Sequence, residues 1–141
     1  MNELARDEVD RFLDEQTVGR IGCHDAGLTY VVPVIYARQA DALYVMTTEG
    51  QKVHMMRKNP SVCFEVDEYE AATGSWRSVI VQGRYEELDG DGKALALSIL
   101  AQRFGTRRVP TERPRVPLGP IVAFCVRIQS ATGRSVRRDG G

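Results

Sequence analysis

Six short strand-like segments, some apolar throughout and some alternating between apolar and polar residues, constrain the fold of this 141-residue chain more than any other feature. The clearest is SVCFEVDE at residues 61–68, whose period of two is that of a strand with one buried face. Tight turns join most of the segments, as at residues 25–27, and only three segments have helical spacing. The pattern predicts a mainly β protein in which an antiparallel sheet closes into a small barrel with peripheral helices.

A single domain is expected, because the length fits one hydrophobic core and no internal repeat or second boundary occurs. The expected parts are an N-terminal helix in 1–16, a barrel in 17–130 with helices near 50–58 and 92–104, and a flexible basic tail in 131–141. Pro33 cannot donate to a β ladder, so its strand is expected at an edge or a bulge, as in a barrel opened along one seam. Gly83 is expected to mark a bulge in the long strand.

Charge and hydropathy exclude several classes of partner. The 19 basic and 19 acidic residues balance, so no overall field favours nucleic acid, and the arginine- and proline-rich stretch 107–115 is interpreted as a solvated loop. No apolar run reaches the length of a membrane helix, and the acidic, amphipathic N-terminus is unlike a signal peptide. Cys23, Cys63 and Cys125 are widely spaced in apolar runs, which is typical of reduced thiols in a cytoplasmic protein.

The segment LYVMTTEGQKVHMMRKNP, residues 43–60, passes from a strand through a polar turn into a helix. If the helix begins near Thr48, then Thr48 and Gln51 form a capping box. The free N–H groups of the first turn, the charge of Lys52 and the hydroxyls of Thr47 and Thr48 are the parts of a phosphate site. An ordinary capped helix with a solvated lysine is the alternative.

A second cluster, Trp76-Arg77-Ser78, opens the long strand. Arg77 and Ser78 can supply phosphate or ring contacts, with Trp76 as an apolar wall; alternatively, Trp76 belongs to the core and Arg77 faces solvent. The histidines, His24 and His54, have no second ligand at metal spacing, so no metal site is expected. No GxGxxG, GxxxxGK[ST] or GxSxG motif is present, and no catalytic acid or base is assigned.

Four segments in order resemble the pyridoxamine 5'-phosphate oxidase-like, FMN-binding split-barrel superfamily, and within it the nitroimidazole-resistance-type branch. They are VGRIGCHDAGLTYVVPVIY, LYVMTTEGQKVHMMRKNPSVCFEVD, WRSVIVQGRYEEL and FCVRIQSATGR, which span most of the chain. The resemblance implies a six-stranded antiparallel split β-barrel. It also implies a homodimer with one flavin at each end of the subunit interface.

The resemblance implies flavin contacts at eleven positions, and the hydroxyl of Thr48 adds a twelfth candidate. They are Val31, Val32, Pro33 and Val34 beneath the isoalloxazine ring, Met46 and Thr47 beside the ribityl chain and phosphate, Thr48, Gln51 and Lys52 at the phosphate, and Trp76, Arg77 and Ser78 on the long strand.

The sequence departs from the family's pattern in three places. Pyridoxal-forming members carry an arginine where Gln51 stands, and their substrate-phosphate motif near the C-terminus has no counterpart. Nitroimidazole-type members often carry a histidine in the turn that reads VMTT in this chain. Neither vitamin B6 oxidation nor nitroreduction therefore carries over from the resemblance.

The leading hypothesis is an FMN-binding flavoprotein, an oxidoreductase acting on an unidentified small molecule, in which the flavin supplies the chemistry. Other members bind F420 or haem, so F420, FAD and haem are alternative cofactors. The rival hypothesis is a non-catalytic flavin, F420 or haem carrier or sensor. An OB-like barrel for single-stranded nucleic acid is a third, disfavoured by zero net charge and few strand aromatics.

Overall fold

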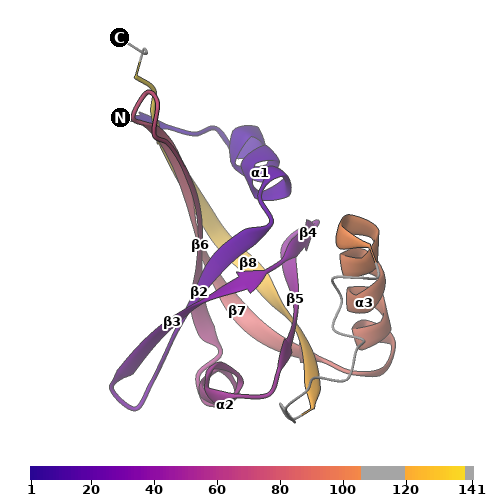
Figure 1. The fold of residues 1–141 in the computed structure, drawn as a ribbon. Helices are drawn as coiled ribbons and strands as arrows, with labels where there is room; N and C mark the ends of the chain where they lie inside the picture. Colours follow the sequence, from indigo (N-terminus) through magenta and orange to yellow (C-terminus); the bar gives the residue numbers. More distant parts are fainter. Residues whose placement is uncertain (106–119, 139–141) are drawn as a thin grey trace.

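An open antiparallel sheet of eight strands organises the chain, and three helices pack around it (Figure 1). The computed structural model describes residues 1–105 and 120–138, so the loop expected at 107–115 lies outside the described residues. The strands are β1 (Asn2–Glu3), β2 (Val18–Asp25), β3 (Leu28–Ile35), β4 (Ala37–Gln39), β5 (Ala42–Thr48), β6 (Ser61–Glu70), β7 (Ser75–Leu88) and β8 (Ile121–Val136). The helices are α1 (Arg6–Glu15), α2 (Gln51–Lys58) and α3 (Gly90–Phe104).

The strand order β3-β2-β6-β7-β8-β5-β4 leaves the sheet unclosed, with β1 added beside β8. The six long strands are those that the alternating pattern predicts, and the two short strands β1 and β4 are additional. β3 stands at one end of the order and approaches β5 across the opening, which we call the seam. The structure therefore confirms the mainly β, split-barrel architecture.

Local backbone chemistry explains the β2–β3 hairpin and the position of β3. The turn residues Ala26 and Gly27 have φ of 51° and 83°, and positive φ at both positions is what a two-residue type I′ turn requires. Among the described residues β3 pairs only with β2, so Pro33 lies in an edge strand, as expected for a residue that cannot donate to a ladder.

Gly83 lies where β7 changes its register with β8. The pairing passes from Gln82 opposite Ser130 to Gly83 opposite Ile128, so one residue of β8 is extra. A Cβ atom at Gly83 would lie 2.5 Å from Val126 Cγ1, closer than carbon atoms can pack. The expected irregularity at this glycine is confirmed, and close backbone approach is its physical reason.

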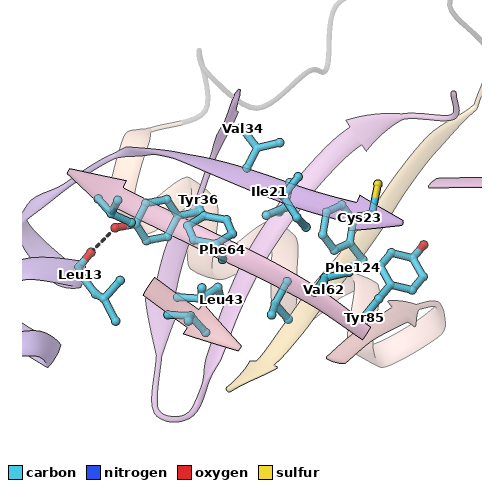
Figure 2. Packing of buried hydrophobic residues seen from close by; sticks show 14 of the residues in the cluster. Leu13, Ile21, Cys23, Val34, Tyr36, Leu43, Val62, Phe64, Tyr85 and Phe124 are labelled. Carbon is cyan, nitrogen blue, oxygen red and sulfur yellow. Dashed lines mark hydrogen bonds between the residues drawn. The ribbon is translucent and has the colours of Figure 1, made fainter. Parts of the chain in front are cut away.

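The main core fills the inner face of the sheet, and α1 and α2 cover it from opposite ends (Figures 1 and 2). At the α1 end, the buried Tyr36 hydroxyl donates a 2.6 Å hydrogen bond to the carbonyl oxygen of Leu13, and the Tyr36 ring meets Phe64 edge-on with centroids 5.0 Å apart. At the α2 end, Met55 and Met56 enter the same core. α3 instead packs on the outer face, against β4, β5 and β8.

The expectation of a flexible tail in 131–141 is wrong for residues 131–136. These residues continue β8, where Ser135 pairs with Asn2 of β1 and with Arg77 of β7. Two long-range partners order a segment whose local sequence is basic and polar. Arg137 and Arg138 follow the strand, and residues 139–141 lie outside the described residues.

None of the helices in the described ranges is long and apolar enough to cross a bilayer. The three cysteines are free thiols: Cys23 and Cys125 are buried and Cys63 is half-buried. The expectation of unpaired cysteines is therefore confirmed.

Candidate functional site

The turn from β5 into α2 exposes an uncapped helix N-terminus. β5 ends at Thr48, α2 begins at Gln51, and the N-cap is Gly50 with extended backbone and no side chain to accept from the first N–H groups. No acidic residue lies in the first turn. Free N–H groups and the helix dipole together favour an anion at this position.

The predicted capping box is wrong. Thr48 does not begin the helix, because it is the last residue of β5 and pairs with Ile121 of β8. Pairing across the sheet thus keeps the Thr48 side chain from the N-cap position and leaves the N–H groups of α2 available.

Lys52 stands in that first turn and is half-buried. Burial lowers the pKa of its ammonium group, and the nearby Cys23 is a weaker, opposing influence. Among the described residues no carboxylate forms an ion pair with Lys52, whereas five arginines are paired. A half-buried cation without a carboxylate partner fits an anionic ligand.

The free edge of β3 lies near this corner of the molecule. β2 joins the two, because Cys23 pairs with Tyr30 of β3 and its thiol faces Lys52 closely enough to influence it electrostatically. In β3, Val32 and Val34 face the core, while Val31 and Pro33 are exposed on the outer face. The backbone groups of β3 that point away from β2 have no partner strand among the described residues and can bond to a ligand.

The predicted residues of β3, β5 and α2 therefore gather around the seam. We call this group the seam site; its members are Val31, Val32, Pro33, Val34, Thr47, Thr48, Gln51 and Lys52. Met46 instead packs against the cluster beneath α3.

Trp76, Arg77 and Ser78 lie elsewhere. Ser78 pairs with Asp67, six residues along β6 from Ser61, so roughly 20 Å of strand separates Ser78 from the residues that follow α2. One copy of the chain does not bring this cluster to the seam site.

Arg77 is already engaged by acidic and aromatic neighbours. Its Nη2 lies 2.7 Å from Glu68 Oε2 and 3.5 Å from Glu15 Oε2, and its guanidinium stacks 4.5 Å from the centroid of Phe12. Trp76 is half-buried, so it belongs neither to the core nor to open surface, and with Arg77 it lines a hollow of about 570 Å³.

Sequence reasoning missed a groove of about 670 Å³ on the outer face of β2, β3, β6 and β7, whose lining includes Gly22, Val31, Cys63 and Gln82. Large apolar side chains stand exposed on this outer face: Val18, Val31, Ile35 and Ile80. The near-continuous apolar run of β3 was the available signal, since a strand with one solvated face should alternate.

Few titratable groups near the seam site are suited to proton transfer. Burial raises the pKa of the Cys23 thiol, so it stays protonated. His54 is exposed on α2, with Nε2 4.0 Å from Glu49 Oε2. In residues 1–105 and 120–138, no three His, Cys, Asp or Glu side chains gather as metal ligands would.

The open antiparallel barrel defines the chain as a split-barrel protein. The chain belongs to the pyridoxamine 5'-phosphate oxidase family, whose pattern matches residues 5–135.

Similar proteins agree with this assignment. An uncharacterized protein of Rhizobium meliloti (strain 1021) is 30% identical over 143 residues, covering 94% of this chain and 93% of the relative. An FAD-binding protein of Mesorhizobium loti is 35% identical, with a TM-score of 0.80 over 96% of this chain and 98% of the other.

Two more distant structures share the fold. One, from Bacteroides thetaiotaomicron, is assigned to 5-nitroimidazole antibiotic resistance; it is 21% identical, with a TM-score of 0.76 over 95% and 86% of the two chains. The other is an FAD-binding protein of Mycobacterium smegmatis, 23% identical, with a TM-score of 0.72 over 97% and 99%.

Proposed function

We propose that this chain is a flavin-binding oxidoreductase of the pyridoxamine 5'-phosphate oxidase family, with the 5'-phosphate of FMN or FAD at the N-terminus of α2. The observation that carries the proposal is Lys52: a half-buried ammonium group without a carboxylate partner among the described residues, beside uncapped N–H groups. FMN and FAD both carry a phosphate group at the 5' end of the ribityl chain. The 35% identical relative binds FAD.

The residues of the seam site have distinct roles in this proposal. Lys52 and the first N–H groups of α2 bind the phosphate, and Thr47 and Thr48 offer hydroxyls beside it. The unpaired backbone edge of Val31–Val34 offers hydrogen bonds to the ring. The bound flavin supplies the redox chemistry. The chain orients the flavin, excludes water from one side of it and neutralises the charge of its phosphate.

Two observations favour a homodimer. The exposed apolar side chains on the outer face of β2, β3 and β7 are of the kind that protein interfaces bury. Trp76 and Ser78 are also too far from the seam site of their own chain to complete it, and a second copy packed against the outer face can supply them. The cytoplasm, where thiols stay reduced, suits the three free cysteines.

A spectrum of the purified protein, followed by titration with FMN, FAD, F420 and haemin, tests the proposal. We expect saturable binding of FMN or FAD, and bleaching of the flavin when NADH or NADPH is added without oxygen. A protein that binds F420 or haemin but neither flavin contradicts the cofactor assignment. A bound flavin that no small-molecule donor reduces identifies a carrier or sensor instead of an oxidoreductase.

A further inference from the structure

Arg57, in the last turn of α2, holds two carboxylates from different parts of the fold. Its Nη1 lies 2.7 Å from Glu49 Oε1, its Nε donates to Glu87 Oε1 at 2.7 Å, and its Nη2 donates to Glu87 Oε2 at 3.1 Å. The hydroxyl of the buried Tyr85 donates to Glu87 Oε1 at 2.7 Å and fixes that carboxylate in turn. These hydrogen bonds raise the pKa of Arg57 and lower that of Glu87, so both groups stay charged.

The position of Glu49 makes this arrangement more than a surface ion pair. Glu49 immediately precedes the N-cap Gly50 and stands three residues before Lys52. Arg57 is seven residues beyond Gly50, roughly 10 Å along the helix axis. The carboxylate of Glu49 is bound by Arg57 and makes no capping hydrogen bond to the first N–H groups of α2.

A carboxylate next to an uncapped helix start is normally attracted to it. Glutamate side chains reach back to free N–H groups in capping boxes, and the helix dipole and Lys52 both favour a negative charge there. Glu49, once released, would occupy the place that a ligand phosphate needs. It would also repel that phosphate.

We propose that Arg57 is a positioning residue that keeps the Glu49 carboxylate out of the anion site at the N-terminus of α2. This inference rests on the proposed function, because the anion in question is the flavin phosphate. Arg57 itself does not touch the ligand; it acts by removing a competing internal anion.

A purely structural role for Arg57 makes a different prediction. The bonds to Glu87 tie α2 to β7, and loss of this tie would loosen the helix whatever Glu49 does. Glu87→Gln removes charge from this arm and leaves the Arg57–Glu49 contact in place, so it is the matched control. Thermal unfolding of each variant reports the structural contribution separately.

The test compares the affinities of the full-length protein for FMN and for riboflavin, which lacks the phosphate. Arg57→Met is expected to weaken FMN binding about tenfold, the effect of a charge at a helix start, with riboflavin binding unchanged. The double variant Glu49→Gln, Arg57→Met is expected to recover FMN affinity to within about twofold of the original protein. Glu87→Gln is expected to leave the FMN-to-riboflavin ratio unchanged.

Three results would overturn the inference: an unchanged ratio in Arg57→Met, no recovery in the double variant, or an equal loss in Glu87→Gln. Glu49→Gln alone tests it even if Arg57→Met fails to fold. Because Arg57 already holds the carboxylate, this change should alter FMN affinity less than about twofold. A large gain in affinity would show that Glu49 already opposes the phosphate and that Arg57 does not restrain it.

The proposed function and this inference fail in different ways. If the unaltered protein binds no flavin, inorganic phosphate is titrated while the amide resonances of residues 51–53 are followed by NMR. Phosphate-dependent shifts that Arg57→Met weakens and the double variant restores would retain the inference and reject the flavin. No shift in any variant would reject both.

Discussion

Lys52 and Arg77 are both cations at places where the sequence predicts a flavin contact, yet the fold treats them in opposite ways. Lys52 is half-buried without a carboxylate partner among the described residues. Arg77 is surrounded by Glu15, Glu68 and the ring of Phe12. The difference favours Lys52 over Arg77 as a ligand contact, because among the described residues only Arg77 has carboxylate partners.

The largest expected effect concerns the surface that would bring these two regions together across a dimer. Val31→Lys places an ammonium group on the outer apolar face, and burying an unpaired charge costs several kcal/mol. The dimer dissociation constant should rise about a hundredfold or more, and flavin affinity should fall with it. Analytical ultracentrifugation over a concentration series measures the change.

Leu95→Lys is the control for this substitution, because Leu95 is similarly exposed but lies on α3, which packs against β4, β5 and β8 and not on β3. It should leave the association state unchanged. Dissociation by Leu95→Lys, or a Val31→Lys protein that stays dimeric, would place the interface elsewhere.

The direct comparison is the effect of removing each cation on FMN binding. Lys52→Ala should weaken binding by about 1.5–3 kcal/mol, the contribution of a hydrogen bond to a charged group. Arg77→Ala should change it by less than about 0.5 kcal/mol, because its guanidinium is already engaged by carboxylates. Isothermal titration calorimetry measures both, and equal losses would erase the distinction between the two regions.

The pH dependence of FMN binding sharpens the assignment to Lys52. Burial lowers the pKa of Lys52, so rising pH removes its proton, and with it the partner of the phosphate, earlier than for an exposed lysine. FMN affinity should therefore fall as the pH is raised from about 7 to 10, and Lys52→Arg should flatten the fall because arginine stays charged. Riboflavin, titrated over the same range, controls for ionisation of the ring.

The smallest expected effects are on the stability of the flavin-free protein. Lys52→Met removes a half-buried charge and should raise the free energy of unfolding by up to about 1 kcal/mol. Arg77→Met removes ion pairs and a ring contact and should lower it by about 1 kcal/mol. Denaturant unfolding measures both, and a stability loss in Lys52→Met would indicate an unrecognised partner for its ammonium group.

The size of the Lys52 effect also depends on pH. The folded-state pKa lies below the unfolded-state value, so the destabilisation is complete below the folded-state pKa and fades as the pH rises toward the unfolded-state value. The gain in the free energy of unfolding that Lys52→Met produces should therefore decrease as the pH rises over that interval.

Features governed by local backbone chemistry were predictable from the sequence. The hairpin turn at Gly27, the edge position of Pro33 and the irregularity at Gly83 each follow from what one residue permits its backbone to do. The strands themselves followed from alternation. These predictions depend on a few neighbouring residues, and the distant parts of the chain do not alter them.

Features set by long-range pairing were not predictable. The local sequence predicts that Thr48 caps a helix, but its pairing with Ile121 makes it the end of a strand. The local sequence also places Ser135 in a flexible tail, but β1 and β7 pair with it on both sides. The contact between Arg57 and Glu87 joins residues thirty positions apart, and no local sequence pattern predicts it. All the predicted flavin contacts, including those of Trp76, Arg77 and Ser78, stay predictions.

The unclosed seam also affects the tendency of the chain to aggregate. A strand with an unpaired edge is a template onto which another chain can add, and such addition leads to aggregation. Pro33 interrupts that edge by removing one donor and fixing one backbone angle, so it acts as a gatekeeper. The same proline that keeps β3 at the edge of the sheet thus limits the addition of a second chain there and reduces aggregation.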